Sequence, residues 1–361
     1  MNKNQKLYPF KFEAGCPVLD ENSTIINGFL SENSIDDVLD TYLGEIAGND
    51  NFQYYKGLFP LKVSFKSIGK EGLAPQLHPD NITASERYMS IGKAKLWYIT
   101  KSTKKTLLYL GFNKAMDATM FYNDCLNGTI TDDLNTISPK EGDYIYIKPG
   151  YVHAVKGELE FIEISQNSEI TYHLTGEDAE MEIAEAIDVV DYSTSNENTW
   201  LVSGVEKDTT IANTSGFIVK YIALNSTIEK QTQESCIIYV CLNGKARINV
   251  NGSSYEFGKD EMVLVPAGMD EFSLANEGEK AGIMEIYLPK VSDIEEDLYM
   301  NYDEDESNYP TGSGTDPEED DEEDNCDCEG ECHCHDHDHC SHDDSDWHNH
   351  PDHPGEFFFR K

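Results

Sequence analysis

KEGDYIYIKPGYVH (residues 140–153) and GKDEMVLVPAGMDE (residues 258–271) are two stretches of this chain that share one pattern. Each has a glycine among polar residues, then a short apolar run, then a turn that contains proline and glycine. Short runs rich in β-branched or aromatic residues that end in such a turn are typical of strands. The repetition predicts a chain built from two similar β units.

Strand patterns also dominate the rest of the first three hundred residues. Leu61–Ile68 alternates apolar and polar residues, and eight short β-rich runs separated by turns rich in Gly and Asn lie between Thr199 and Tyr287. Many short strands at regular spacing predict a barrel or jelly roll. Helical spacing occurs at Ser34–Ile46, with Ser34 as N-cap, in parts of 114–137, and near 177–189.

The net charge of −41 is distributed unevenly. Residues 301–361 hold 22 acidic and two basic residues, whereas residues 1–300 hold 46 acidic and 25 basic ones. Nucleic acid and anionic membranes would repel such a chain, so neither is expected as a partner. No apolar run approaches the ~20 residues of a membrane span, and Met1–Lys6 lacks the apolar core of a secretory signal. We therefore expect a cytoplasmic protein.

The C-terminal segment 293–361 is predicted to be a disordered acidic tail, because its charge is high and its apolar content is low. From Cys326 to His353 it holds thirteen cysteines and histidines in 28 residues. A solvated acidic tail does not account for this density, and the spacing is not that of a zinc finger, so we expect several labile metal sites. The candidate ligands are Cys326, Cys328, Cys332, His333, Cys334, His335, His337, His339, Cys340 and His342. The scattered cysteines Cys16, Cys125, Cys236 and Cys241 are expected to be reduced thiols.

The body of the chain contains only three histidines, His78, His153 and His173. Gln76 precedes His78 by two residues, so on a strand both side chains point to the same face. His153 follows the proline–glycine turn of the first repeated stretch, whereas the second stretch has acidic residues at that place. We therefore expect a metal-binding pocket in the first β unit alone.

Four ordered motifs resemble the type I mannose-6-phosphate isomerase family in its short bacterial form. They are QLHPD at 76–80, GKAKLWY at 92–98, PGYVHA at 149–154 and SQNSEITYH at 165–173. The family patterns are Q-x-H-P-D, G-K-x-E-x-W-Y, P-A-G-x-x-H-A and E-I-Q-Q-x-S-D-x-T-Y-R. The resemblance extends from about residue 25 to about residue 290.

This resemblance implies a mainly β fold of two cupin (jelly-roll) barrels with a few surface helices. The first barrel, with a helical insertion, is expected at 1–175, and it contains the metal and sugar pocket. The second barrel, without metal ligands, is expected at 176–292, and the tail follows at 293–361.

The resemblance also implies a site and a reaction. Gln76, His78 and His153 match ligands of one divalent metal, usually zinc. The substrate is a hexose 6-phosphate, and mannose 6-phosphate and fructose 6-phosphate are interconverted while the metal stabilises an enediolate. Lys93 matches a lysine beside the sugar, so Lys93 and His173 are the candidate catalytic residues.

Two positions depart from the family pattern. Lys95 stands where the family has its metal-binding glutamate, and His173 stands where it has a pocket arginine. Two like unit charges ~4 Å apart repel by about 4 kcal/mol at an effective dielectric near 20, and a divalent ion doubles this. Several interpretations stay open: retained isomerisation, lost catalysis with a role in metal handling or sugar-phosphate sensing, and a rebuilt metal site in which His173, with Glu163 nearby, becomes a ligand.

A first prediction concerns the tail. Removing residues 301–361 is expected to remove most of the bound metal, because the thiol and imidazole groups gathered there are good ligands for zinc, copper and nickel. Elemental analysis of the full-length and truncated proteins after equilibration with zinc measures this. An unchanged metal stoichiometry would contradict the prediction.

Overall fold

The computed structural model describes residues 6–13, 15–176, 179–232, 234–278 and 280–294. All ten candidate ligands of the predicted tail, and all of its residues after Ile294, lie outside these ranges. The described part is mainly β, with 21 strands in four sheets and short helices around them. The predicted mainly β class with a few helices is thereby confirmed.

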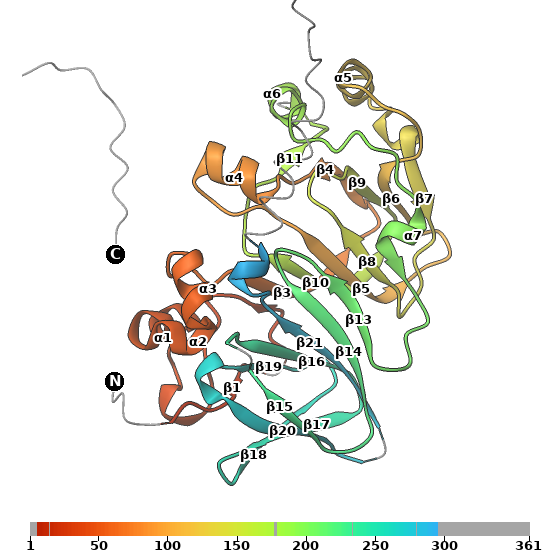
Figure 1. The fold of residues 1–361 in the computed structure, drawn as a ribbon. Coiled ribbons are helices and arrows are strands. Elements are labelled where there is room, and N and C mark those ends of the chain that lie inside the picture. Colours follow the sequence, from red (N-terminus) through yellow and green to blue (C-terminus); the bar gives the residue numbers. More distant parts are fainter. Residues whose placement is uncertain (1–5, 14, 177–178, 233, 279, 295–361) are drawn as a thin grey trace, which may run out of the picture. The chain divides into compact units, whose positions relative to one another are not determined.

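Two of the sheets form what we call the first sandwich (Figure 1). Sheet I has the strand order β12-β8-β5-β10-β3-β2, and sheet II has the order β11-β4-β9-β6-β7. Trp97 and Ile145 of sheet I pack with Leu108 and Val155 of sheet II in one core cluster, so the sheets lie face to face. The strands are β2 (Val18–Leu19), β3 (Leu61–Ile68), β4 (Leu73–Leu77), β5 (Lys95–Ser102), β6 (Leu107–Phe112), β7 (Leu134–Ile137), β8 (Tyr144–Ile147), β9 (His153–Lys156), β10 (Leu159–Gln166), β11 (Tyr172–His173) and β12 (Leu201–Val202).

The other two sheets form the second sandwich. Sheet III has the order β1-β19-β16-β21-β14-β13, and sheet IV has the order β15-β20-β17-β18. Tyr239 and Ile283 of sheet III share a core cluster with Ile248 and Leu274 of sheet IV. The strands are β1 (Phe10–Lys11), β13 (Thr209–Asn213), β14 (Ile218–Leu224), β15 (Ile228–Gln231), β16 (Ile237–Asn243), β17 (Lys245–Val250), β18 (Ser253–Gly258), β19 (Met262–Val265), β20 (Glu271–Asn276) and β21 (Ala281–Tyr287).

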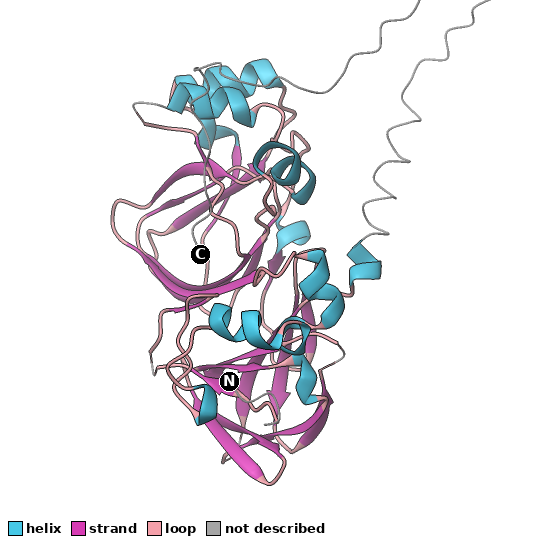
Figure 2. Ribbon diagram, turned by 90° about the vertical axis from the view of Figure 1, so that its left-hand side faces the viewer, coloured by secondary structure: helices cyan, strands magenta, loops and turns pink. Residues whose placement is uncertain are grey.

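The two sandwiches are joined back to back through sheets I and III (Figure 2). Ile164 on β10 and Val240 on β16 belong to this shared core, whereas their neighbours Glu163 and Tyr239 face the interior of their own sandwich. Side chains alternate along a strand, so a strand buried on both faces is apolar at nearly every position. Glu163 is therefore conspicuous as a charged residue inside such a strand.

Strand pairing crosses the predicted domain boundaries. The N-terminal strand β1 pairs with β19 of sheet III, and β12 pairs with β8 of sheet I. Each sandwich thus receives a short edge strand from a distant part of the chain. The boundaries at 175 and 292 stay a prediction.

Helices cover the outside of the sheets. The segment predicted as one helix from Ser34 forms two, because Leu43 has a φ of 52° and ends the first helix, which Ser34 and Asp37 cap reciprocally. Of the strand expected at 199–205, only Leu201–Val202 forms, because Trp200 ends a short helix and is buried in the core of the first sandwich. The helices are α1 (Ile35–Tyr42), α2 (Gly44–Ala47), α3 (Asn49–Tyr54), α4 (Asn81–Tyr88), α5 (Ala118–Leu126), α6 (Ala179–Ala186) and α7 (Glu197–Trp200), with 3-10 turns η1 (Gly28–Leu30), η2 (Ile130–Asp133) and η3 (Ala267–Met269).

Two further expectations bear on the described residues. Cys16, Cys125, Cys236 and Cys241 are free thiols, as predicted. In the part of the chain that the structure describes, every helix is too short or too polar to cross a membrane.

A second prediction tests the contact between the N-terminal helices and the second sandwich. Gly48 lies between α2 and α3 with a φ of 103°, and an added Cβ would collide with the carbonyl oxygen of Glu234. Gly48→Ala is therefore expected to lower the free energy of unfolding by more than about 1 kcal/mol. Urea denaturation measures the loss. Gly69→Ala is the matched control, since a Cβ there meets no atom within 4 Å, and equal stability of the two variants would refute the prediction.

Candidate functional site in the first sandwich

Three strands of sheet I place charged and polar side chains on the inner face of the first sandwich. Glu163 on β10 lies opposite Ser64 on β3 and opposite Trp97 on β5. Residues directly opposite each other on paired strands share a face, as do residues two apart on one strand. Lys66 and Lys95 therefore lie on the same face as Glu163.

Glu163 binds both lysines and the indole. Lys66 Nζ lies 2.7 Å from Oε1, Trp97 Nε1 donates to Oε2 at 2.8 Å, and Lys95 Nζ lies 3.6 Å from Oε2. The Glu163 and Lys95 side chains are only 3% and 5% exposed. An isolated charge in such a place would be very costly, so each of the two depends on the other.

The pKa values of this pair show the balance between burial and attraction. Burial raises the pKa of Glu163, but the charges of Lys95 and Lys66 outweigh burial and hold this pKa at about 2. Burial lowers the pKa of Lys95 to about 8, although Glu163 opposes the shift. The Glu163 charge therefore stabilises the fold above its ordinary pKa of 4.5, and this contribution is lost as the pH falls towards 2.

Two buried histidines lie next to this network, with ring centroids 5.2 Å apart. His78 Nδ1 is 2.9 Å from the carbonyl oxygen of Ile170, and His153 Nδ1 is 3.1 Å from that of Tyr151. A carbonyl only accepts hydrogen bonds, so each Nδ1 donates and each Nε2 carries a lone pair. Burial, reinforced by the charge of Lys95, lowers the pKa of His153 to about 3 and that of His78 well below its usual value. Both rings are therefore neutral at physiological pH.

Gln76 completes the contact between strands β4 and β9. Its backbone pairs with that of His153, and its amide Nε2 is 3.2 Å from His153 Nε2, where it donates to the lone pair. His78 Nε2 has no such donor, because it is buried without a hydrogen-bond partner. The hydroxyls of Ser64 and Ser165 are also buried without partners. Buried polar groups are rarely left unpaired, so three of them in one sandwich mark this interior as the candidate site for a polar ligand.

The two predicted catalytic residues differ in burial: Lys93 is buried, whereas the side chain of His173 is exposed. Lys93 is 8% exposed, and burial lowers its pKa, while Glu169 and Glu163 oppose the shift. The His173 side chain is 56% exposed, and its Nδ1 lies 2.9 Å from Glu182 on α6. Although His173 pairs with Gln76 across β11 and β4, no contact between the described residues joins its ring to His78 or His153.

The structure therefore brings together most of the predicted site, but not in a form that fits a divalent ion. The two imidazole nitrogens are suitable donors, and the bare Nε2 of His78 is where a ligand atom would be expected. However, the charge of Lys95 acts on both histidines, Gln76 faces His153 with its amide nitrogen, and Glu163 is held by its three partners. Among the described residues, no group of three or more His, Cys, Asp or Glu is placed to hold a metal.

Sequence reasoning missed Ser64, Lys66 and Ser165. The sequence did contain a sign of Ser64 and Lys66. In Leu61–Ile68 apolar and polar residues alternate, which places both side chains on the face opposite the shared core. The contact of Lys66 with Glu163 joins residues 97 positions apart, so it requires the register of β3 and β10.

The fold consists of antiparallel sheets packed in pairs, and two histidines lie inside the first sandwich. These features define a mainly β protein of the cupin type. Solved structures agree with this class. The mannose 6-phosphate isomerase from Bacillus subtilis superimposes with a TM-score of 0.57 at 21% identity, covering 74% of this chain and 85% of that one. A variant of phosphomannose isomerase from Salmonella typhimurium gives 0.61 at 12% identity, covering 75% and 90%. At these identities the likeness shows the fold alone.

Sequence comparisons find similarity to mannose-6-phosphate isomerases. A family model described as "Mannose-6-phosphate isomerase, cupin domain" matches residues 207–284. The mannose-6-phosphate isomerase of Streptococcus mutans is 25% identical over 234 residues, which are 62% of this chain and 72% of the relative. Mannose-6-phosphate isomerase ManA of Bacillus subtilis is 26% identical over 231 residues, with 60% and 72% covered. Over these aligned parts the chain is similar to mannose-6-phosphate isomerases.

A third prediction tests the buried network. Glu163→Gln is expected to lower the free energy of unfolding by about 3–5 kcal/mol, because Lys95 is left as an uncompensated buried charge. Adding Lys95→Met should restore part of this loss. The matched control is Glu160→Gln on the same strand, since its pair with Lys101 is 48% and 68% exposed and such pairs contribute about 0–1 kcal/mol. Chemical denaturation at pH 7 measures all four proteins, and a small loss in Glu163→Gln would refute the prediction.

Proposed function

We propose that this chain is a mannose-6-phosphate isomerase-like protein that binds a hexose 6-phosphate, mannose 6-phosphate or fructose 6-phosphate, in the first sandwich. The observation that carries the proposal is a pair of buried lysines, Lys93 and Lys95, beside three unpartnered polar groups. In a chain of net charge −41, this concentration of positive charge favours an anionic ligand.

The charges of the pocket match a phosphorylated sugar. Lys66, Lys93 and Lys95 bring three positive charges to the site, and Glu163 brings one negative charge. A phosphate group uses this surplus through charge-assisted hydrogen bonds. The hydroxyls of the sugar find donors and acceptors in the unpartnered groups already described, as in other small-molecule pockets with a few polar anchors.

The family is metal-dependent in general, and aldose–ketose interconversion moves a proton between adjacent carbons. Such a reaction needs a base and a cation that stabilises the developing oxyanion. Here the pKa of His153 is about 3, which makes it a weak base at pH 7, and His173 is held by Glu182 at the exposed edge. We therefore propose that hexose 6-phosphate binding is retained and that Lys95 suppresses the metal-dependent isomerisation.

Isomerisation with zinc at Gln76, His78 and His153 is the second candidate. The bare Nε2 of His78 favours it, because its orientation is that of a metal ligand supported by a backbone carbonyl. It requires that Lys95 give up its proton or leave the pocket. In either case we place the protein in the cytoplasm, as predicted from the sequence.

A fourth prediction separates binding from turnover. Calorimetry is expected to show that mannose 6-phosphate binds at least about tenfold more tightly than mannose, because ionic hydrogen bonds to phosphate contribute about 1.5–3 kcal/mol. Lys93→Met should remove most of this difference. Lys101→Met, which changes an exposed lysine on β5, is the control. Equal affinity for the two sugars in the wild type would refute the binding proposal.

The same proteins are assayed for fructose 6-phosphate formation with zinc present. For the wild type we expect only background turnover. Zinc content is measured with a chain that lacks residues 301–361, and we expect no zinc in the first sandwich of the wild type. The Lys95→Glu variant should bind one additional zinc equivalent. Efficient turnover by the wild type would overturn the suppression by Lys95 and establish the second candidate instead.

A further inference from the structure

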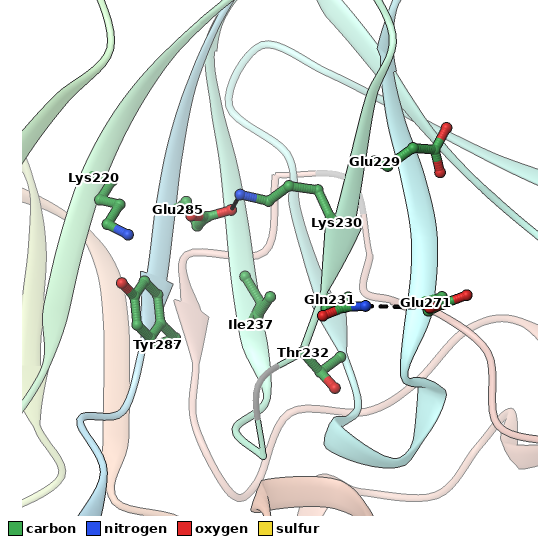
Figure 3. Close-up of a pocket in the computed structure, with 9 residues that line it drawn as sticks. All are labelled: Lys220, Glu229, Lys230, Gln231, Thr232, Ile237, Glu271, Glu285 and Tyr287. Carbon is green, nitrogen blue, oxygen red and sulfur yellow. Dashed lines mark hydrogen bonds and ion pairs between the residues drawn. The ribbon is translucent and has the colours of Figure 1, made fainter.

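A second polar cavity opens in the second sandwich, away from the site described above. Its volume is 530 Å³, and strands of both sheet III and sheet IV line it (Figure 3). This volume lies within the range of about 300–1,000 Å³ that is usual for small-molecule sites. The residues that matter are Lys220, Glu285 and Tyr287 on sheet III, and Lys230, Gln231 and Glu271 at sheet IV.

The inner face of sheet III carries a charged group at this cavity. Lys220, Glu285 and Tyr239 lie opposite one another on β14, β21 and β16, so their side chains share one face. Further along the same face, Ile222 and Ile283 belong to the apolar core. Glu285 is only 3% exposed. A carboxylate at this place interrupts an otherwise apolar interior.

Glu285 is held by two groups. Lys230 reaches across from β15, with its Nζ 2.5 Å from Glu285 Oε2, and the Tyr239 hydroxyl donates to the same oxygen at 2.8 Å. A buried ion pair is rarely more stabilising than apolar residues of the same volume. Its presence beside an open cavity is therefore better explained by a ligand than by stability.

Lys220 supplies a positive charge that this pair does not neutralise. It lies opposite Glu285 in the register, yet no carboxylate among the described residues lies within 4.0 Å of its ammonium, which sits 5.1 Å from the centre of the Tyr287 ring. Figure 3 shows Lys220 and Lys230 on opposite sides of Glu285. One carboxylate thus faces two ammonium groups.

The described lining on the opposite side of the cavity has no positive charge and includes the carboxylates of Glu229 and Glu271. Gln231 Nε2 donates to Glu271 Oε1 at 3.2 Å, and both side chains are exposed. Carboxylate and amide groups side by side are suitable partners for the hydroxyl groups of a sugar, because together they offer donors and acceptors. The cavity therefore has an anion-binding end and a hydroxyl-binding end.

We infer that this cavity is a second ligand site, which binds a monosaccharide bearing one phosphate or carboxylate. The anionic group lies against Lys220 and Lys230, and the hydroxyls lie against Gln231 and Glu271. The inference does not rest on the function proposed for the first sandwich, because the two sites share no residue.

The test is calorimetric titration of the full-length chain with glucose 6-phosphate, glucuronate and glucose. At least one of the two anionic sugars is expected to bind at a site that Lys220→Met weakens at least tenfold and that Lys220→Arg retains. Glucose is expected to bind at least tenfold more weakly. If only glucose 6-phosphate binds, the site accepts a phosphate. If only glucuronate binds, it accepts a carboxylate, and if both bind it accepts either group.

Two controls keep this site apart from the first. Lys93→Met alters the first sandwich and should leave the Lys220-dependent binding unchanged, and Lys207→Met, at an exposed lysine outside the cavity, should do the same. Thermal unfolding confirms that Lys220→Met folds like the wild type. Equal binding in Lys220→Met and the wild type, or binding of neither anionic sugar, would overturn the inference.

Discussion

The carboxylate of Glu163 is the interaction on which the pocket of the first sandwich depends. It lies inside a strand that is buried on both faces, where a charge is tolerated only with partners. Lys66, Trp97 and Lys95 provide these partners from two neighbouring strands. Without Glu163, the ammonium of Lys95 would have no anion within reach in a dry interior. The position of Lys95 follows from this one carboxylate, whereas burial is the main cause of the low pKa values of both histidines, which Lys95 lowers further.

Much of this arrangement was predictable from local pattern. Gln76 and His78 are two residues apart, so strand geometry placed them on one face, and the resemblance to mannose-6-phosphate isomerases added His153 to the same site. The pairing of Gln76 with His153 and the ring contact between the histidines agree with that expectation. The Ser34 cap was equally visible, because capping depends on residues only three positions apart.

Other features depended on contacts that no local pattern contains. The bond between Lys66 and Glu163 requires the register of β3 and β10. His173 lies opposite Gln76, but Glu182 on α6 holds its ring, and the packing of that helix could not be read from the motif around His173. Aromatic residues such as Trp200 are common in strands, but Trp200 ends a short helix and packs in the core of the first sandwich.

The substitution of Lys95 has a simple electrostatic consequence. By resemblance, mannose-6-phosphate isomerases place a divalent ion and a glutamate ligand at the position of Lys95, and the two together carry one net positive charge. A protonated lysine carries the same net charge. In the proposed function, the attraction for an anionic sugar is therefore maintained, whereas the ability of a metal to polarise two substrate oxygens at once is lost. This proposal separates binding from turnover, which one ion supports together in a metal site, at a single position of β5.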